Sequence, residues 1–467
     1  MLFSSITFIY YFLPVVILLY FIVPFRFKNL VLFCASIFFY FWGEPVYTLI
    51  MIFTALSGYL HGLLIDQFRG TKASKVWVVS SIVVSLAVLG LFKYSDFFVE
   101  TWNGLFKTDV ALLKLALPIG ISFYTFQTLS YTIDLYRGTT KVQKNFLNFA
   151  TYVVLFPQLI AGPIVRYVDV EKELTERKHN FENFAYGVNR FVLGMAKKVL
   201  LANQFGELCE IFKATDEKTI VFYWVYALAY ALHIYFDFSG YSDMAIGLGR
   251  IFGFHFPENF NYPYISKSIT EFWRRWHITL SSWFRDYVYI PLGGNRVSKL
   301  KWFRNILIVW ALTGMWHGAG WNFIAWGLFF AVLLILEKAF LGDLLKKIPA
   351  VFSWFYTMIL VFISWILFDA ESIQMALSRI VAMFGGAGIA FNNSVTSYYF
   401  ISYAFLLEIG CIGATPLCKI LVNKLKEKEW ANRVVNVLEP IVQVVLLLVV
   451  TAYLVDGSFN PFLYFRF

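Results

Sequence analysis

Long apolar runs separated by short polar or charged segments recur along almost the whole chain. A helix that crosses a bilayer needs about 20 consecutive, mostly apolar residues. Near the start, residues 6–23, 46–65 and 76–92 have this character, and residues 30–42 form a shorter apolar run. We therefore expect a series of apolar α-helices. The first run lacks the basic start and small-residue cleavage site of a signal peptide, so we expect it to stay as a helix.

The apolar pattern is less regular in the middle of the chain. Residues 115–133 include Pro118, Gly120 and several polar side chains, which predicts a broken or re-entrant helix covered by protein or water. Residues 306–336 are apolar but are interrupted by a glycine-rich stretch. The other apolar segments are 146–160, 186–201, 220–236, 244–254, 351–368, 398–414 and 437–455.

Residues 261–304 depart from this pattern. They contain eight Lys and Arg against Glu271 and Asp286, and they are rich in Trp and Tyr. This composition is typical of short helices that lie in the membrane interface or dip into it. The whole pattern predicts an all-α polytopic membrane protein with about ten or eleven transmembrane helices. Because we find no repeat and no linker, we expect residues 1–467 to form a single integral-membrane domain.

The composition agrees with a membrane protein and excludes several other classes. The chain is 59% hydrophobic and 15% charged, whereas a soluble domain has about 45–50% apolar and about 25% charged residues. A soluble fold of this composition could not cover its apolar surface. A soluble enzyme, a disordered protein and a nucleic-acid-binding module are therefore excluded, and no nucleic-acid partner is expected.

The net charge of +10 fits basic loops beside anionic lipid. The basic loops at residues 26–28 and 69–75 alternate with an acidic one at residues 43–45. Positively charged loops favour the cytoplasmic side, so we expect both basic loops in the cytoplasm and the N-terminus outside. Three of the arginines could instead bind the phosphate groups of a cofactor.

His317 is the sharpest candidate for chemistry. It lies in the stretch Thr313-Gly314-Met315-Trp316-His317-Gly318, with apolar sequence on both sides. Ionisable residues inside apolar helices are costly and often functional. Burial disfavours the imidazolium, so a neutral ring could take a proton from an attacking hydroxyl. The alternative is a packed histidine bonded to a neighbouring carbonyl.

A second histidine, His277, follows a basic and aromatic segment, Phe272-Trp273-Arg274-Arg275-Trp276. It is either part of a site or an interfacial residue of a lipid-facing helix. Arg274, Arg275 and Arg285 suit either a phosphate-bearing cofactor or lipid headgroups, because arginine makes bidentate contacts with both.

Other motifs are weaker. His233 and Asp237 are one helical turn apart and could form a buried polar contact, although the spacing is one residue short of the H-x4-D of some acyltransferases. No Walker A motif occurs, so ATP-driven transport by this chain is not expected. The four cysteines form no C-x-x-C, so we expect no metal site and no permanently bound cofactor.

Taken together, several long motifs resemble the membrane-bound O-acyltransferase family. They look closer to its bacterial alginate O-acetyltransferase branch than to the D-alanyl-transferring branch. The motifs cover most of the chain, and the densest lie within residues 233–330. They are Leu117-Pro118-Ile119-Gly120, Phe156-Pro157-Gln158, Phe236-Asp237-Phe238-Ser239-Gly240-Tyr241-Ser242-Asp243, Phe256-Pro257-Glu258-Asn259-Phe260, Phe272-Trp273-Arg274-Arg275-Trp276-His277 and Pro291-Leu292-Gly293-Gly294-Asn295-Arg296.

The resemblance implies a ring of helices around a central tunnel in a bacterial cytoplasmic membrane. It implies that His317 is the catalytic histidine and His277 the second motif residue. The acyl donor would be cytoplasmic acetyl-CoA, whose phosphates Arg274, Arg275 and Arg285 could hold. Trp316 and Asn322 would shape the site. The acetyl group would reach an extracytoplasmic polysaccharide through an SGNH-type partner protein.

Two other functions stay open at this point. The chain could transfer a longer acyl group to a lipid or a protein, which would need an apolar lateral cavity. It could also be a non-enzymatic transporter or scaffold for acyl groups or glycans, in which case His317 would not be required. The acceptor polymer is not readable from the residues.

Overall fold

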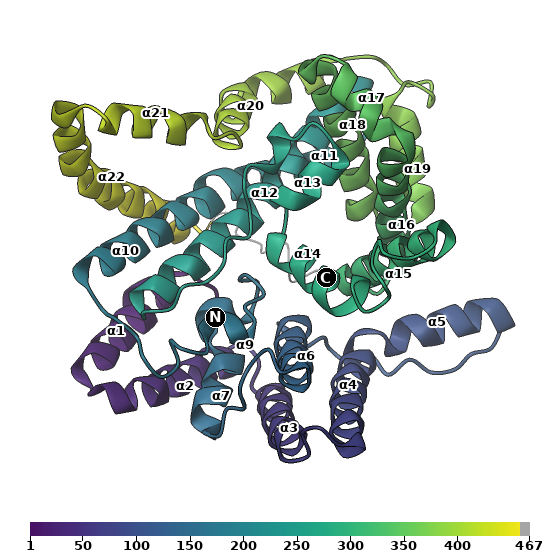
Figure 1. The fold of residues 1–467 in the computed structure, drawn as a ribbon. Helices are drawn as coiled ribbons and strands as arrows, with labels where there is room; N and C mark the ends of the chain where they lie inside the picture. Colours follow the sequence, from purple (N-terminus) through teal and green to yellow (C-terminus); the bar gives the residue numbers. More distant parts are fainter. Residues whose placement is uncertain (458–467) are drawn as a thin grey trace. The chain divides into compact units, whose positions relative to one another are not determined.

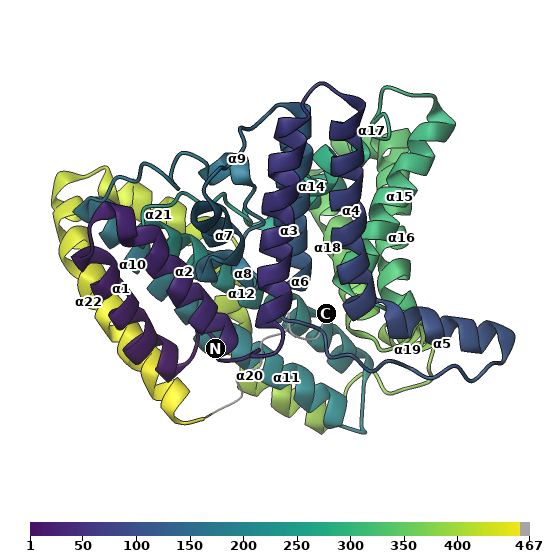
Figure 2. The ribbon, with the colours of Figure 1, turned by 90° about the horizontal axis from the view of Figure 1, so that it is seen from below.

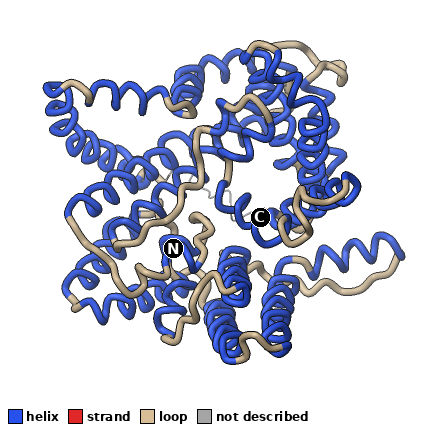
Figure 3. Tube along the Cα trace, viewed as in Figure 1, coloured by secondary structure: helices blue, strands red, loops and turns tan. Residues whose placement is uncertain are grey.

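The computed structural model describes residues 1–457, and these fold into helices joined by loops, without a strand (Figure 1, Figure 3). The chain divides into two compact units. The first unit comprises residues 1–191 and 241–258, and the second comprises residues 192–240 and the chain from residue 259 onward. Because the unit boundaries fall within α10 and α12, these two helices contribute to both units.

The first unit is built around three helices that pack side by side, α3 (Thr48–Gln67), α4 (Lys72–Lys93) and α6 (Ile121–Arg137) (Figure 1, Figure 2). The helix α6 is buried over most of its length, as expected of a central helix. The remaining helices of this unit are α1 (Leu13–Ile22), α2 (Phe25–Phe41), α5 (Ser95–Phe106), α7 (Phe146–Val154), α8 (Phe156–Leu159), α9 (Tyr167–Val170) and most of α10 (Phe181–Ala196).

The second unit contains the segments predicted to carry chemistry. Its helices are α11 (Asn203–Ala214), α12 (Ile220–Ile251, up to residue 240), α13 (Ile269–Arg275), α14 (Ile278–Phe284), α15 (Lys299–His317), α16 (Trp321–Leu336), α17 (Gly342–Lys347), α18 (Ala350–Asp369), α19 (Ile373–Met383), α20 (Ser394–Gly413), α21 (Leu417–Lys426) and α22 (Glu429–Val455).

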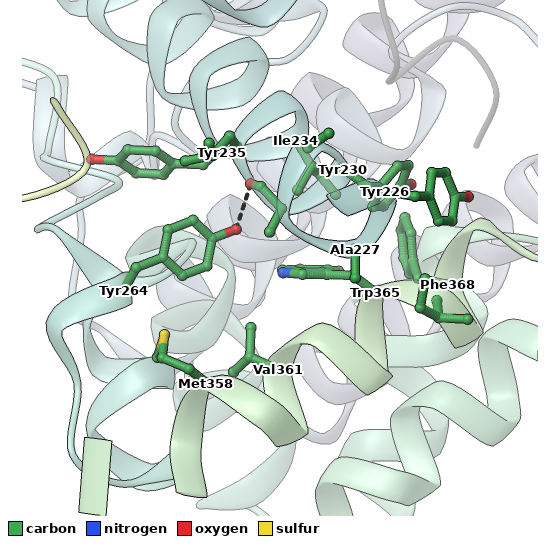
Figure 4. Close-up of a cluster of buried hydrophobic side chains, with 14 of the residues drawn as sticks. Tyr226, Ala227, Tyr230, Ile234, Tyr235, Tyr264, Met358, Val361, Trp365 and Phe368 are labelled. Atoms are coloured by element: carbon green, nitrogen blue, oxygen red, sulfur yellow. Dashed lines mark hydrogen bonds between the residues drawn. The ribbon is translucent and has the colours of Figure 1, made fainter. Parts of the chain in front are cut away.

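An aromatic core joins α12 and α18 in the second unit. Tyr226 and Tyr230 of α12 lie near Trp365 and Phe368 of α18, and the Tyr264 hydroxyl donates to the Ala231 carbonyl at 2.6 Å (Figure 4). Burying a phenol requires a partner for its hydroxyl, and a carbonyl of the neighbouring helix supplies it. This core fixes the two helices that carry Phe238 and Phe368, which contact the candidate site.

Seven helices within residues 1–457 are long and apolar enough to cross a membrane. Two shorter apolar stretches, Phe8–Ile22 and Ile373–Met383, fall below that length. A multi-pass all-helical membrane protein is therefore confirmed, whereas residues 1–457 hold fewer candidate spans than the ten or eleven helices predicted. The predicted ring and tunnel stay predictions, because both concern the placement of one unit against the other.

Two segments differ from the sequence prediction. Residues 220–236 and 244–251 belong to one continuous helix, α12, which ends at Ile251, because its central polar side chains are buried in the unit rather than exposed in a loop. Residues 115–120 are not helical, and α6 begins only after Gly120, whose φ of +75° is in the left-handed region. The prediction of short helices in residues 261–304 is confirmed by α13, α14 and the turns around them.

The central polar stretch of α12 is held by a buried ion pair. The Lys198 ammonium lies 2.6 Å from the Asp237 carboxylate, and each side chain is only 2% exposed. The predicted contact between His233 and Asp237 is electrostatic and not a hydrogen bond, because neither His233 ring nitrogen has a hydrogen-bond partner within residues 1–457. Lys198 lies on a π-helical turn, Lys197–Ala202, a rare local structure that often marks a constrained position.

Glycines allow the helices α15 and α16 to approach closely. A Cβ atom at Gly314 would lie 2.2 Å from the Phe323 carbonyl oxygen, and one at Gly327 would lie 2.1 Å from the Trp310 carbonyl oxygen. Only glycine fits such backbone contacts, which are typical of tightly packed membrane helices. The tight pair sets the position of His317 at the end of α15.

Candidate active site

His317 is the last residue of α15, where the sequence turns to Gly318-Ala319-Gly320 and the helix ends. The side chain is 6% exposed. It is enclosed by aromatic rings at centroid distances of 4.9 Å for Trp316, 5.0 Å for Trp326 and 5.3 Å for Phe368, all edge to face. An imidazole in such a setting is shielded from bulk water.

His277 lies between α13 and α14 and is fully buried. Its backbone has φ +44° and ψ +54°, a left-handed conformation that is costly for a residue with a Cβ atom. Its ring packs edge to face against Phe238, with centroids 4.7 Å apart. Strained backbone that persists in a buried place is typical of functional sites.

Asn259 fixes the tautomer of His277. Its Oδ1 atom accepts hydrogen bonds from the Thr279 backbone N–H at 3.2 Å and the Thr279 hydroxyl at 2.9 Å, and it lies 3.1 Å from His277 Nδ1. Because a backbone N–H can only donate, the Asn259 atom is an oxygen, and Nδ1 of a neutral His277 must carry the proton. Nε2 of His277 is then left with a lone pair.

The two histidines lie near each other. The Trp316 ring contacts both, at 5.7 Å from the His277 ring and 4.9 Å from the His317 ring. Burial lowers the pKa of His277 well below its usual range, and the proximity of His317 lowers this pKa further. His277 is therefore neutral at physiological pH.

The helix ends give the two imidazoles different electrostatic settings. His317 is at the C-terminus of the 19-residue helix α15, where the partial negative charge of the helix stabilises a cation. His277 is the N-cap of α14, where the partial positive charge disfavours a cation. His317 is thus better suited to accept a proton, and His277 to remain neutral.

Trp326 adds a donor beside His317. It is fully buried, and its Nε1–H has no hydrogen-bond partner within residues 1–457. Leaving a buried donor unpaired costs about 1–3 kcal/mol. This cost is accounted for if the Trp326 N–H donates a hydrogen bond to a bound substrate.

The other predicted site residues fall into two groups. Trp316 contacts both histidines, as a residue that shapes the site would. The Asn322 amide instead donates to the Ala370 carbonyl at 2.8 Å, which ties the start of α16 to the end of α18. Asn322 therefore acts on the site through the helices that carry Trp326 and Phe368.

The three predicted arginines have different surroundings. Arg275 is paired with Glu271 at 2.9 Å, and Arg285 with Asp286 at 2.7 Å, while Arg274 is exposed. Of the three, Arg285 lines the cavity of about 270 Å³ that α13, α14, α15 and α16 enclose together with Lys338. Thr313, one turn before His317 on α15, lines the same cavity.

Sequence reasoning missed three residues of this site. Asn259 lies in a motif that was recognised, but no feature of the sequence pairs it with His277. Trp326 and Phe368 lie in ordinary apolar helices, where aromatic residues are common. Their proximity to His317 follows from the packing of α15, α16 and α18 and has no signal in residue spacing.

The described part of the chain therefore defines a multi-pass helical membrane protein with a buried pair of histidines. Residues 37–380 match the membrane-bound O-acyltransferase family. Because the match covers most of the chain, the chain belongs to this family and is an O-acyltransferase.

Three relatives show which branch is similar. The chain is 44% identical to an alginate O-acetylase, AlgI, of Pseudomonas aeruginosa, over 82% of this chain and 75% of the relative. It is 35% identical to a peptidoglycan O-acetyltransferase of Helicobacter pylori, over 84% and 81%. It is 33% identical to a teichoic acid D-alanyltransferase of Bacillus subtilis, over 48% and 59%.

Proposed function

We propose that the chain takes an acetyl group from cytoplasmic acetyl-CoA and delivers it for O-acetylation of an extracytoplasmic polysaccharide. The observation that carries this proposal is the buried histidine pair in a chain whose relatives include enzymes named for O-acetylation of alginate and of peptidoglycan. The cytoplasmic membrane of a bacterium is the proposed location.

His317 acts as the general base in this proposal. It removes the proton from an acceptor hydroxyl, and the hydroxyl oxygen then attacks the thioester carbonyl carbon. When the C–S bond breaks, the sulfur of CoA takes the proton back from the His317 imidazolium. The C-terminus of α15 stabilises that imidazolium while it exists.

His277 positions the acceptor. With Nδ1–H held by Asn259, its Nε2 can accept a hydrogen bond but cannot donate one to a carbonyl. An acceptor of this kind can hold the hydroxyl group of the acceptor substrate, but it cannot polarise the carbonyl group of a thioester. The unpaired Trp326 Nε1–H is a donor of the kind that a developing oxyanion needs.

The cavity beside Arg285 and Lys338 supports a place for the donor. Its cationic rim suits phosphate groups, and its walls contain Trp273, Trp310 and other apolar side chains that suit a pantetheine arm. Arg274 and Arg275 lie on α13, one of the helices that enclose it. An SGNH-type extracytoplasmic partner is proposed to receive the acetyl group, since the polymer itself lies outside the membrane.

Transfer of label from [¹⁴C]acetyl-CoA tests the proposal. Membranes containing the chain, its SGNH-type partner and the polymer are expected to yield labelled polymer, and membranes without the chain are not. Hexadecanoyl-CoA in a parallel reaction examines the alternative of a longer acyl group. Transfer of the long chain but not of acetyl, or no dependence on the chain, would contradict the proposal.

Substitution of Asn259 tests how His277 is used. Asn259→Leu removes the acceptor for Nδ1–H and is expected to lower acetyl transfer about 10–100-fold, the cost typical of losing a partner that orients a histidine.

Asn259→Asp keeps an acceptor but adds a buried negative charge, which raises the pKa of His277. Because the neutral ring is the active form, the acidic limb of the pH–rate profile should move to higher pH.

A matched control is Asn145→Asp at the start of α7, where the side chain accepts from the Asn148 backbone N–H and an aspartate can do the same. Its pH–rate profile should equal that of the unaltered protein. An unshifted profile for Asn259→Asp would show that His277 has no part in the reaction.

A further inference from the structure

A second cavity lies in the first unit, and its lining includes none of the residues assigned above. It has a volume of about 390 Å³ and is lined by Phe21 of α1, His179, Asn183 and Phe184 of α10, and Arg250 at the end of α12. Its lining combines aromatic faces with groups that donate hydrogen bonds.

Two buried cations lie behind this lining. Lys28 is 8% exposed, and its ammonium lies 4.3 Å from the Tyr20 ring centroid and 4.9 Å from that of Phe21. No carboxylate or hydrogen-bond acceptor within residues 1–457 pairs with it. A lysine so deeply buried without an anion is rare, because lysine is almost never fully buried unless paired.

Arg177 is the second of these cations and is 7% exposed. Its guanidinium donates to the Asn29 side-chain oxygen at 2.6 Å and to the Glu173 carbonyl at 3.1 Å, and neither acceptor carries a charge. The carboxylate of Glu173 is instead 2.5 Å from His255 Nδ1. Within residues 1–457 neither Lys28 nor Arg177 forms an ion pair, although burial lowers the pKa of Arg177 and the nearby Glu173 carboxylate raises it.

The positive charge of Lys28 and Arg177 changes the pKa of His179 in the wall of the cavity. The Tyr20 hydroxyl lies 2.8 Å from His179 Nε2. Burial lowers the pKa of His179, and the charges of Lys28 and Arg177 lower it further. Arg250, whose guanidinium is 3.3 Å from the Asn183 side-chain oxygen, adds a third positive charge on the opposite helix.

The N-terminus of α10 adds partial positive charge to the same cavity. Asn180 caps this 16-residue helix by accepting from the Asn183 backbone N–H at 2.7 Å. The partial positive charge of a helix N-terminus favours an anion. One acidic side chain, Glu182, lies in this first turn and is exposed.

The rim of the cavity is apolar and open. Phe181 is 85% exposed and Phe21 is 42% exposed, and Phe21 belongs to the apolar helix α1. Lys28, which contacts the Phe21 wall, belongs to the basic first turn of α2 at residues 26–28, which is expected on the cytoplasmic side. A ligand for this place needs a phosphate for the cations and apolar chains for the rim.

We propose that this cavity binds the headgroup of an anionic phospholipid of the cytoplasmic leaflet. Arg250 of the lining lies beside its phosphate, Lys28 and Arg177 add positive charge from behind the lining, and its acyl chains run along Phe21 and Phe181. A soluble phosphate compound such as the nucleotide part of CoA would use the cations but leave the exposed aromatic rim uncovered. The lipid is therefore the occupant that accounts for both features.

Native mass spectrometry of the full chain in detergent tests this. The protein is titrated with phosphatidylglycerol and with phosphatidylcholine of identical acyl chains. We expect phosphatidylglycerol to bind about tenfold more tightly, and Lys28→Gln with Arg250→Gln to remove this preference, since each lost charged hydrogen bond is worth about tenfold. Arg250→Gln alone, at a partly exposed position, serves if the double variant does not fold.

The matched control is Lys172→Gln with Lys178→Gln, which removes the same charge at two exposed positions outside the cavity and should keep the preference. Equal binding of the two lipids, a preference that survives Arg250→Gln, or displacement of phosphatidylglycerol by adenosine 3′,5′-diphosphate would overturn the proposal. The measurement needs no acyl donor, so its outcome is independent of the proposed acetyl transfer.

Discussion

Replacing His317 by alanine is expected to lower acetyl transfer in membranes by about 10²–10⁴-fold, the range contributed by a general base. The reason is that the ring is enclosed by Trp316, Trp326 and Phe368, so bulk water cannot easily replace it as a proton acceptor. The rate of label transfer from acetyl-CoA measures the effect.

The control for this variant is His61→Ala, which removes a histidine from an apolar helix outside the site. His61 lies in α3, with its Nδ1 atom 2.8 Å from the Ser57 carbonyl and its Nε2 atom 3.1 Å from the Ser80 hydroxyl. This variant should keep most of the activity. Full activity in a folded His317→Ala protein, judged by gel filtration, would exclude His317 as the base.

The sequence was most informative where a residue conflicts with its surroundings. The glycine-rich interruption of residues 306–336 lies where α15 ends at His317 and α16 begins at Trp321. The basic, aromatic stretch at residues 261–304 likewise predicts short helices, which the structure confirms. In both places the local pattern alone is sufficient.

The prediction failed where distant partners decide the structure. The apolar pattern divides this region into segments 220–236 and 244–254, but Lys198 neutralises Asp237 inside the unit and α12 continues to Ile251. Gly240 permits this packing, since a Cβ atom there would lie 2.7 Å from the Gly194 carbonyl oxygen. No spacing rule connects Lys198 with Asp237 across 38 intervening residues.

The same limit applies to the site. The left-handed backbone of His277 and its bond to Asn259 depend on how residues 259–261 run beside residues 275–278, where Asn261 N–H donates to the Arg275 carbonyl and Ile278 N–H to the Asn259 carbonyl. Such pairing is a property of the folded chain. A histidine tautomer can therefore be assigned only after the fold is known.

Replacing Lys198 by methionine is expected to lower the free energy of unfolding by about 3–5 kcal/mol, because it leaves the Asp237 carboxylate buried without its counter-charge. Methionine fills a similar volume, so the loss of charge dominates the effect. Cys209 is buried, while Cys34, Cys411 and Cys418 are exposed. With the three exposed cysteines changed to alanine, the temperature at which a thiol reagent labels Cys209 reports unfolding of this unit.

The double variant Lys198→Met with Asp237→Leu separates the ion pair from packing. Removing both charges together is often neutral or stabilising in buried pairs, so the labelling temperature should return most of the way to that of the parent protein. Lys197→Met, at the neighbouring and partly exposed position, controls for the π-helical turn and should change stability by only about 0.5 kcal/mol. If the double variant were as unstable as Lys198→Met alone, the lysine stem and not its charge would hold α12, and the continuity of that helix would need another cause.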